Sequence, residues 1–507
     1  MPSRPQTLES LTTSPLDLLV IGGGIVGAGI ARDAAMRGLR VGLVEQHDFA
    51  FGTSSRSSRL LHGGMRYLAQ GRLGLVRQAS IEKKILHLIA PHLAEPLPFI
   101  FPAYAGDRHW RLWQLKIGVK LYDLLCGGRN LGRSEWLNLR KTLNQVPTLN
   151  PTRLKGAVRY YDGFTNDARL VLDTLRSASR HGAHLLNYCR FENAERKQHD
   201  GMSLWICQLR DSLAEKAFLV RTRAVANATG PWAHGLPHSA VNLRLTKGVH
   251  IVVDRDRIPV QDALVMTEGQ RILFAIPWGK RTILGTTDTD YTGSLDDVRA
   301  APDDIRYLLE VANRFFPNAR LGQSDVISTW AGLRPLIASS NGTPSDISRA
   351  HEIRCPERGW WDVAGGKLTT YRLMAEETVD QIVNWLKKEA GRGSGGEGGT
   401  AAPSTRDPRP AFSLCRTADE PLLPADDATG VSAISPPELS HMLVEHYVRS
   451  EWAVHLDDVM VRRTSWHYYF PEAQQMAERV ADWMGELLGW PPEIRGAELE
   501  RYQRLRT

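Results

Sequence analysis

The chain has 507 residues, of which 42% are hydrophobic and 23% are charged, and its formal net charge is +7 at pH 7. This length predicts two or three domains, and the composition is typical of a soluble globular protein. No apolar run reaches the ~20 residues that a membrane-spanning helix needs. The positive balance favours an anionic ligand or surface. No basic motif with interleaved aromatic residues indicates nucleic acid.

The N-terminus and the cysteines bear on the compartment. The opening stretch, MPSRPQTLESLTTSP, lacks the apolar core of a signal peptide, and we expect it to be a disordered lead-in to a cytoplasmic protein. The five cysteines are scattered without a CxxC pair, which predicts reduced thiols and neither a metal site nor a disulfide framework. They are Cys126, Cys189, Cys207, Cys355 and Cys415.

A strand, a glycine-rich turn, a helix and a second strand follow in the order of a dinucleotide-binding unit. Residues 17–21 form the apolar strand, and Gly22, Gly24 and Gly27 form a GxGxxG set. Gly22 permits the tight turn, Gly24 lets a pyrophosphate approach the backbone, and Gly27 lets the helix pack close to the strand. The helix N-terminus attracts phosphate, and Glu45 after the second strand can accept hydrogen bonds from a ribose diol.

A polar stretch, DFAFGTSSRSSRLLHGGMRYL, covers residues 48–68. Its hydroxyl groups can donate to phosphates, and its glycines let the backbone approach a planar ring. The imidazole, guanidinium and phenol groups can hold an anion or move a proton. From these residues alone, an ordinary polar loop is an equally good interpretation. The candidate residues are Thr53, Ser54, Ser55, His62, Gly63, Gly64, Arg66 and Tyr67.

Apolar runs farther along predict a second set of strands. Residues 221–228 form a strand that ends at Thr229 and Gly230, a turn that can bring backbone close to a cofactor. Three β-rich runs in 247–287 (VHIVV, ILFAIPW and TILGTT) predict an antiparallel substrate-domain sheet.

Three helices are predicted around these strands. Residues 168–181 and 303–316 have helical periodicity. The pair Gly365 and Gly366 precedes a helix from Lys367, and its N-terminus can stabilise negative charge on a bound ring.

Residues 108–126, RHWRLWQLKIGVKLYDLLC, predict an amphipathic helix. Trp110, Trp113, Ile117 and Leu121 can share one face, and the basic residues fall largely elsewhere. The pattern suits a helix that lies on an anionic membrane. Packing of the apolar face into the protein core is an equally good interpretation.

Gly, Ser and Pro dominate much of residues 389–436, which predicts a flexible linker. Helical patterning resumes at residues 435–438, where a capping box combines with prolines in the first turn. Helices are expected at 451–463 and 471–488, so that residues 437–507 form a C-terminal helical domain.

Together these strings resemble the FAD-dependent, quinone-linked glycerol-3-phosphate dehydrogenases. After the glycine turn come TSS…SS…HGG-x-RYL, NDARLV, NATGPW, KG-x-HIVV, IPW, GTTD, G-x-RPL and GGKLTTYR, in the order of that family. Asn166 departs from the family pattern, which has Asp there.

The resemblance implies an α/β fold of the α+β two-domain flavoenzyme type: a Rossmann-like FAD-binding domain and an antiparallel-sheet substrate domain within residues 15–388, followed by the small C-terminal helical domain. The expected FAD-binding parts are about 15–105, 150–245 and 325–388, and the substrate or cap parts are about 106–149 and 246–324.

The resemblance also implies the reaction. The family oxidises sn-glycerol 3-phosphate to dihydroxyacetone phosphate by hydride transfer to N5 of FAD, and the electrons pass to ubiquinone or another quinone. This activity serves glycerol 3-phosphate catabolism and respiratory electron input. It implies peripheral association with the inner face of the cytoplasmic membrane, and a homodimer is compatible with it.

The substrate needs a clamp for its phosphate. Arg334 is expected to bind the phosphate, because a guanidinium can do so bidentately. Arg66 and Lys367 are expected to add positive charge or to polarise the C2 oxygen, and Tyr67 and Thr370 to contact the substrate.

The reaction also needs a base for the hydroxyl proton. His250 and His62 are both candidates because imidazole titrates near neutral pH, and the sequence does not choose between them. With the candidates of residues 48–68 and the first glycine turn, the expected FAD contacts include Thr229, Gly230, Gly365, Gly366, Lys367 and Leu368.

The sequence is also compatible with other functions. A related FAD-dependent oxidase or dehydrogenase could act on another hydroxy or amino acid. A flavin-binding protein without catalysis is also conceivable, although the cationic residues Arg66, Arg334 and Lys367 argue against it. An NAD-only dehydrogenase is disfavoured, because it has no use for the second glycine turn or for the GGK helix.

Overall fold

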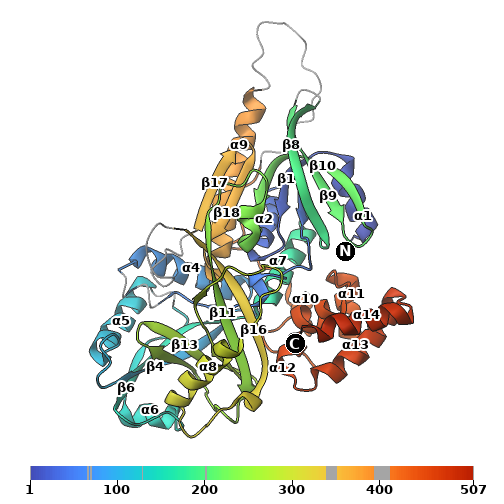
Figure 1. Ribbon diagram of the computed structural model, residues 1–507. Coiled ribbons are helices and arrows are strands. Elements are labelled where there is room, and N and C mark those ends of the chain that lie inside the picture. Colours follow the sequence, from blue (N-terminus) through green and yellow to red (C-terminus); the bar gives the residue numbers. More distant parts are fainter. Residues whose placement is uncertain are drawn as a thin grey trace.

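Two large sheets and a C-terminal group of helices make up the protein (Figure 1). The structure is a computed structural model, and the residues it describes are 2–64, 68, 71–127, 130–199, 202–338, 351–392 and 412–505.

The first sheet has a parallel centre, in the order β18-β10-β1-β2-β7. Every residue of β1 is buried, which explains its continuous apolar sequence. β17 and β9 extend this sheet with antiparallel pairing. Its strands are β1 (Leu16–Ile21), β2 (Val41–Val44), β7 (His184–Leu186), β8 (Cys189–His199), β9 (Met202–Asp211), β10 (Lys216–Asn227), β17 (His351–Glu357) and β18 (Trp360–Gly365).

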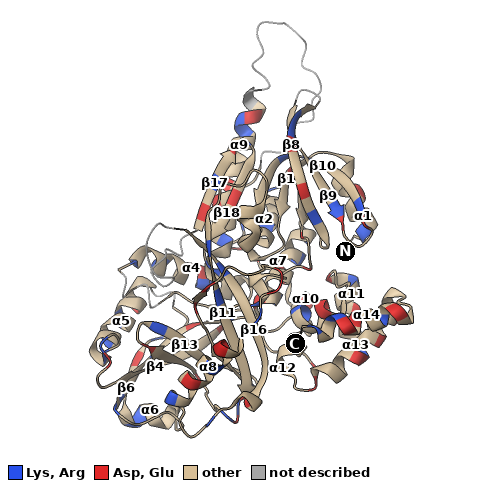
Figure 2. Ribbon diagram, viewed as in Figure 1, with Lys and Arg blue, Asp and Glu red and all other residues tan. Residues whose placement is uncertain are grey.

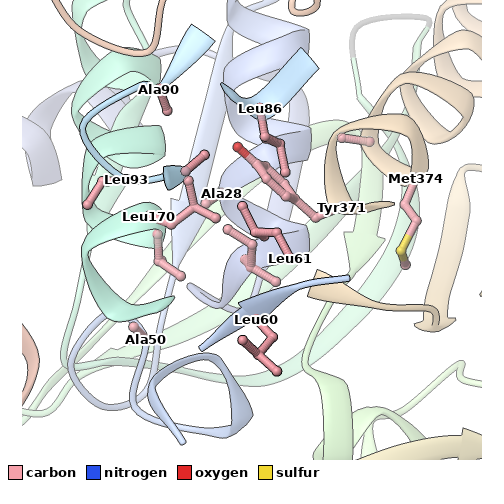
Figure 3. Close-up of a cluster of buried hydrophobic side chains, with 14 of the residues drawn as sticks. Ala28, Ala50, Leu60, Leu61, Leu86, Ala90, Leu93, Leu170, Tyr371 and Met374 are labelled. Carbon is pink, nitrogen blue, oxygen red and sulfur yellow. The ribbon is translucent and has the colours of Figure 1, made fainter. Parts of the chain in front are cut away.

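Helix α2 (Ile25–Met36) follows the glycine turn and packs against both α7 (Asp167–Arg180) and α9 (Tyr371–Arg392). Ala28, Leu170 and Tyr371 meet in the core that these helices share (Figure 3). α4 (Leu73–Ile89) adds Leu86 to this cluster. The helix predicted at 168–181 is therefore confirmed.

The second sheet is antiparallel apart from the parallel pair β12–β4, which confirms the antiparallel sheet predicted from residues 247–287. α8 (Pro302–Phe315) packs against it, as its periodicity predicts. The strands are β3 (Leu60–Leu61), β4 (Glu95–Tyr104), β5 (Glu135–Asn138), β6 (Leu154–Phe164), β11 (Leu243–Asp254), β12 (Ala263–Glu268), β13 (Arg271–Trp278), β14 (Arg281–Gly285), β15 (Thr289–Asp290) and β16 (Val326–Ile337).

The expected disordered lead-in is wrong. Helix α1 (Arg4–Thr13) begins with a capping box in which Ser3 and Gln6 exchange hydrogen bonds. Leu11 is fully buried, and Arg4 forms an ion pair with Asp211 at 2.7 Å. These long-range contacts order a segment whose polar composition predicts disorder.

Helix α5 (Leu112–Leu125) confirms the predicted helix but not its single apolar face. Trp110 precedes the helix and is buried, with its indole N–H donated to the carbonyl of Gly269 at 3.0 Å. The inward side of α5 carries Leu115, Val119 and Tyr122. The outward side exposes Trp113, Ile117 and Leu124, by 58%, 60% and 74%. Packing into the core is therefore confirmed for the inward side, and membrane contact of the outward side stays a prediction.

The predicted flexible linker is wrong over its second half, because residues 412–436 pack onto the flavoenzyme core. The amide of Leu422 donates to the carbonyl of Ile89 at 2.8 Å, and Arg32 donates to the carbonyls of Thr417 and Glu420. The Gly-rich part, 393–411, lies outside the described residues.

The C-terminal helices begin later than predicted. The helix expected from 435–438 starts at His441, and residues 451–455 form a loop before a π-helical segment, η5 (Asp458–Arg463). The helix predicted at 471–488 is confirmed as α13. The C-terminal helices are α10 (Ala425–Ala428), α11 (His441–Ser450), α12 (Trp466–Tyr469), α13 (Ala473–Leu488) and α14 (Pro492–Gln503).

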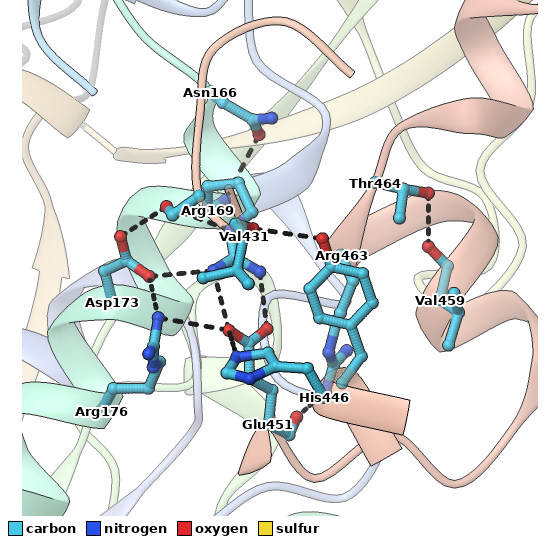
Figure 4. A network of polar contacts seen from close by, with 12 residues as sticks. Asn166, Arg169, Asp173, Arg176, Val431, His446, Glu451, Val459, Arg463 and Thr464 are labelled. Atoms are coloured by element: carbon cyan, nitrogen blue, oxygen red, sulfur yellow. Dashed lines mark hydrogen bonds and ion pairs between the residues drawn. The ribbon is translucent and has the colours of Figure 1, made fainter. Parts of the chain in front are cut away.

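Buried ion pairs attach these helices to the core (Figure 4). The carboxylate of Glu451 accepts hydrogen bonds from Nη1 and Nη2 of Arg169, at 2.6 and 2.9 Å. Nη1 of Arg176 lies 3.3 Å from the same carboxylate. Arg462 and Arg463 pair in the same way with Asp48, which lies in the loop after β2. The C-terminal segment is thus held against the loop that continues into residues 53–58.

Candidate functional site

A cavity of about 400 Å³ is lined by residues from both sheets. The glycine turn and residues 51–58 contribute to its wall, as do the turn after β10, the strands β11 and β16, and the turn after β18. It therefore brings together motifs that are far apart in the sequence, such as those of Gly24 and Gly365.

The first glycine turn has the geometry that a pyrophosphate needs. Gly22 has a φ of 107°, and a Cβ there would lie 2.6 Å from the carbonyl oxygen of Ala228. A Cβ on Gly27 would lie 1.9 Å from the carbonyl oxygen of Gly22, so helix and turn touch. Gly24 caps α2, whose first turn contains no acidic residue. The positive end of the α2 dipole can therefore attract an anion without repulsion from a carboxylate in the first turn.

Glu45 lines the cavity at the end of β2. Its carboxylate accepts the N–H groups of Gly23 at 2.7 Å and of His47 at 2.9 Å. Burial raises its pKa, and these N–H groups oppose the rise. Thr53 and Ser54 also line the cavity, and the hydroxyl of Ser54 accepts the N–H of Ile25 at 3.0 Å.

The second helix N-terminus faces the same cavity. Gly365 and Gly366 have φ values of 73° and 77° and lead through Lys367 into the short turn Leu368–Thr370 and then α9. Gly365, Gly366, Lys367 and Leu368 all line the cavity. The backbone N–H of His62 donates to the hydroxyl of Thr369 at 3.0 Å, which joins this turn to the HGG segment.

Four predicted contacts do not line the cavity, and one of them is Gly27, which instead lets α2 pack closely on the turn. Ser55 is buried beside it, and the hydroxyl of Thr370 lies 3.3 Å from the carbonyl of Lys367. Gly63 is needed for another reason: a Cβ there would lie 2.1 Å from the hydroxyl of Tyr122. Arg66 and Tyr67 lie outside the described residues.

The remaining predicted residues are brought together. Besides those already described, His62, Gly64, Thr229, Gly230, His250 and Arg334 line the cavity. Sequence reasoning missed Ser58, Thr286 and Asp288, although the GTTD and TSS strings contain or adjoin them.

Arg334 on β16 is held in place by neighbours on three sides. Its guanidinium donates to the hydroxyl of Thr286 at 2.9 Å and forms an ion pair with Asp288 at 3.1 Å. Gly248 on β11 leaves room for it, because a Cβ there would lie 2.3 Å from Nη2 of Arg334. The result is an oriented cation in the cavity wall.

His250 lies two residues along β11 from Gly248 and is only 2% exposed. Its Nε2 lies 2.8 Å from the hydroxyl of Ser58, and its ring stacks on Trp330 with 5.1 Å between centroids. Burial, with the positive charges of Arg334 and Arg59, lowers the pKa of His250 to about 3. The imidazole is therefore neutral at physiological pH.

The described residues form neither a metal site nor a disulfide. Within the described ranges, no cluster of His, Cys, Asp and Glu could hold a metal ion. The five cysteines are all unpaired, and burial raises the pKa of each.

Two glycine turns, two helix N-termini, a buried carboxylate after β2 and a cationic pocket together define a dinucleotide-binding oxidoreductase of the flavoprotein class. The chain belongs to the FAD-dependent oxidoreductase family, whose profile matches residues 17–381. Residues 419–495 match the family "C-terminal domain of alpha-glycerophosphate oxidase".

Individual relatives agree with this assignment. The chain is 38% identical over 402 residues to the aerobic glycerol-3-phosphate dehydrogenase of Staphylococcus aureus, covering 76% of this chain and 70% of that protein. It is similar to the structure of the glycerol-3-phosphate dehydrogenase from Bacillus halodurans complexed with FAD, with a TM-score of 0.75, 29% identity and coverage of 99% and 96%. L-α-glycerophosphate oxidase from Mycoplasma pneumoniae shares the fold at 18% identity, with a TM-score of 0.58 and coverage of 73% and 95%.

Proposed function

We propose that the protein oxidises sn-glycerol 3-phosphate to dihydroxyacetone phosphate, with FAD as hydride acceptor and a quinone as the final electron acceptor. Arg334, fixed over Gly248 in the wall of the cofactor cavity, is the observation that carries the proposal. The similarity to the glycerol-3-phosphate dehydrogenases of Staphylococcus aureus and Bacillus halodurans supports it.

The phosphate would bind at Arg334. A guanidinium matches two phosphate oxygens, and charge-assisted hydrogen bonds of this kind are stronger than neutral ones. The contacts to Thr286 and Asp288 orient the guanidinium before the substrate arrives, which reduces the entropy lost on binding. Lys367, at the start of the second helix, would add positive charge from another wall of the cavity.

We infer that His250, and not His62, accepts the proton. His250 and Gly248 are separated by two residues on one strand, which is about 6.7 Å and keeps both on one face. A phosphate on Arg334 would therefore place the rest of a small substrate toward His250. FAD, when bound, supplies the acceptor for the hydride from C2. The neutral imidazole is able to take the proton that the hydroxyl loses.

An anaerobic titration tests the proposal. The protein is purified with its flavin, its visible spectrum is recorded, and sn-glycerol 3-phosphate is added. Bleaching of the oxidised flavin band near ~450 nm, followed by recovery with a quinone analogue, is the expected result. A yellow protein that does not bleach would retain the cofactor but exclude this substrate and lead to the hydroxy-acid and amino-acid alternatives.

A variant assigns the phosphate site. Arg334→Ala is expected to raise the KM for glycerol 3-phosphate severely while FAD stays bound. An unchanged KM would show that the phosphate binds elsewhere. Substrates without phosphate provide the comparison, because their KM depends less on a guanidinium.

A peripheral membrane location would give the enzyme access to quinone. No helix of the described part of the chain is both long and apolar enough to cross a bilayer. The outward side of α5, with Trp136 on β5 and Leu139 at the start of α6 (Leu139–Gln145), exposes several large apolar groups; we call this surface the α5 patch. Lys116 lies over the ring of Trp136 at 3.8 Å, and Figure 2 shows further basic residues on α5 and α6. This combination suits the interface of an anionic bilayer.

Vesicle sedimentation tests the α5 patch. The variant Ile117→Asp/Leu124→Asp is expected to bind anionic phospholipid vesicles much less than wild type, because each change places a charge among lipid chains. Met442→Asp is the matched control, since Met442 is 75% exposed on α11, away from the patch. Equal binding by all three proteins would exclude the patch as the contact surface.

A further inference from the structure

The imidazole of His250 is almost fully buried at the wall of the cavity. Nδ1 of His250 is buried and has no hydrogen-bond partner in the part of the chain that the structure describes. Nε2 faces the hydroxyl of Ser58 at 2.8 Å, and Ser58 itself lines the cavity. A group in the cavity can therefore exchange a proton with the imidazole through this hydroxyl, whereas Nδ1 offers no exposed surface.

Rigid neighbours pack around the imidazole of His250. Trp330 stacks on one face of the imidazole, and a Cβ on Gly285 would lie 2.3 Å from its Cδ2. The indole N–H of Trp330 donates to the carbonyl of Ser57 at 3.1 Å. The same tryptophan thus holds both His250 and the backbone next to Ser58, which fixes the distance between the hydroxyl and the imidazole.

The buried guanidinium of Arg59 packs close to Trp330 and so supports the position of His250. The guanidinium of Arg59 lies 4.3 Å from the ring of Trp278 and 5.5 Å from the ring of Trp330. Its Nη2 donates to the hydroxyl of Ser465 at 3.0 Å, so the C-terminal helices contribute to the same layer. Asp167 lies 3.8 Å from Nε of Arg59 and also accepts the amide of Ser57. The segment 57–59 is therefore held at each residue.

We propose that Ser58 is a catalytic residue that relays the substrate proton to His250. This inference rests on the proposed function. The C2 hydroxyl of the substrate gives its proton to Oγ of Ser58, while the proton already on Ser58 passes to Nε2 of His250. The C2–H bond breaks as the carbon–oxygen double bond forms, and FAD, when bound, would supply the acceptor for the hydride. One proton and one hydride leave the substrate, and Ser58 ends as it began.

The charges around His250 permit such a relay once the substrate is bound. In the free protein, Arg334 is one of the two positive groups that lower the pKa of His250. A phosphate dianion on Arg334 neutralises that charge, so the pKa of His250 rises when the substrate binds. The imidazole becomes a stronger base at the moment when it has a proton to accept.

A set of variants tests the relay in the holoenzyme by stopped-flow flavin reduction. Ser58→Ala is expected to slow reduction by about 10²-fold or more, the usual effect of losing a proton-transfer group. The affinity for dihydroxyacetone phosphate, measured from the flavin spectrum, is expected to change less than about twofold. Ser58→Thr, which keeps a hydroxyl, is expected to recover most of the rate. Ser58→Ala/His250→Gln is expected to be no slower than the slower single variant, because both residues act in one step.

Other results would overturn the relay. Reduction of Ser58→Ala at the wild-type rate, or a double variant whose loss is the product of the two single losses, would mean that His250 acts without Ser58. A parallel loss of rate and of affinity, without recovery in Ser58→Thr, would mean that Ser58 only shapes the cavity.

A proton inventory on the wild-type enzyme makes the test independent of folding in the variants. Reduction rates in mixtures of light and heavy water are expected to curve downward with the deuterium fraction, because two protons move together. A straight line would mean that one proton moves and would overturn the relay. A wild-type flavin that glycerol 3-phosphate does not reduce at all would refute the proposed function itself, so the two failures are distinguishable.

Discussion

Gly248→Ala is expected to damage the phosphate site without damaging the fold. The new methyl group would lie 2.3 Å from Nη2 of Arg334, and ordinary van der Waals contact begins at 3.4 Å. The tip of Arg334 must therefore move by roughly 1 Å, and a displacement of this size can cost about 10²-fold in rate. This corresponds to about 2.8 kcal/mol in transition-state stabilisation, at about 1.4 kcal/mol for each factor of ten in kcat/KM.

The assay is kcat/KM for glycerol 3-phosphate, with the flavin content measured in the same preparation. FAD is expected to remain bound, because the groups that must move are the side-chain ends of Arg334 and Thr286 and not backbone. Gly118→Ala is the matched control: a Cβ at this position in α5 would meet nothing within 4 Å. An unchanged kcat/KM in Gly248→Ala would refute the assignment of Arg334 as the phosphate clamp.

Two further predictions concern stability. Glu451→Gln is expected to lower the free energy of unfolding by about 3–5 kcal/mol, because it leaves the buried Arg169 without its main partner. Glu445→Gln, which breaks an exposed pair with Arg449, is expected to change it by about 0.5 kcal/mol or less in the same urea titration. Equal effects would refute the role of burial. His250 has a folded-state pKa of about 3 against an ordinary ~6.5, so its contribution to stability is fully present above pH ~6.5 and is lost as the pH falls toward 3. Between pH 6.5 and 4, the stability of His250→Gln is therefore expected to fall less steeply than that of wild type, by up to about 1.4 kcal/mol per pH unit, and parallel curves would show that the imidazole is not buried neutral.

Local patterns predicted the elements whose structure depends on neighbouring residues. The first strand, its glycine turn and the helix after it occur as expected. A tight turn and a closely packed helix require glycine at fixed positions, and this spacing can be recognised in the sequence. The antiparallel strands of 247–287 and the helices at 168–181 and 303–316 carry equally direct periodicity. In each case, the residues that form the recognisable pattern lie within a few positions of one another, even where the element pairs with a distant strand.

Tertiary contacts overruled the sequence pattern elsewhere. The polar N-terminus is helical because Arg4 and Leu11 find partners far along the chain. Residues 412–436 are ordered by their contacts with the core, and the composition of the segment does not indicate these contacts. Helix α5 has apolar groups on two sides, and periodicity alone does not tell which side the protein covers.

The same distinction between local pattern and tertiary contact applies to the residues of the site. The sequence by itself indicated the cofactor class and offered Arg334 as the phosphate ligand and His250 or His62 as the base, because glycine spacing and charged motifs can be recognised within short stretches. Only the tertiary structure decided how these groups meet. It placed Ser58 against His250 across 192 positions, opened a space for Arg334 at Gly248, and gave Gly63 a packing partner in Tyr122. Such pairs depend on the register between distant strands, and no single stretch of sequence encodes that register.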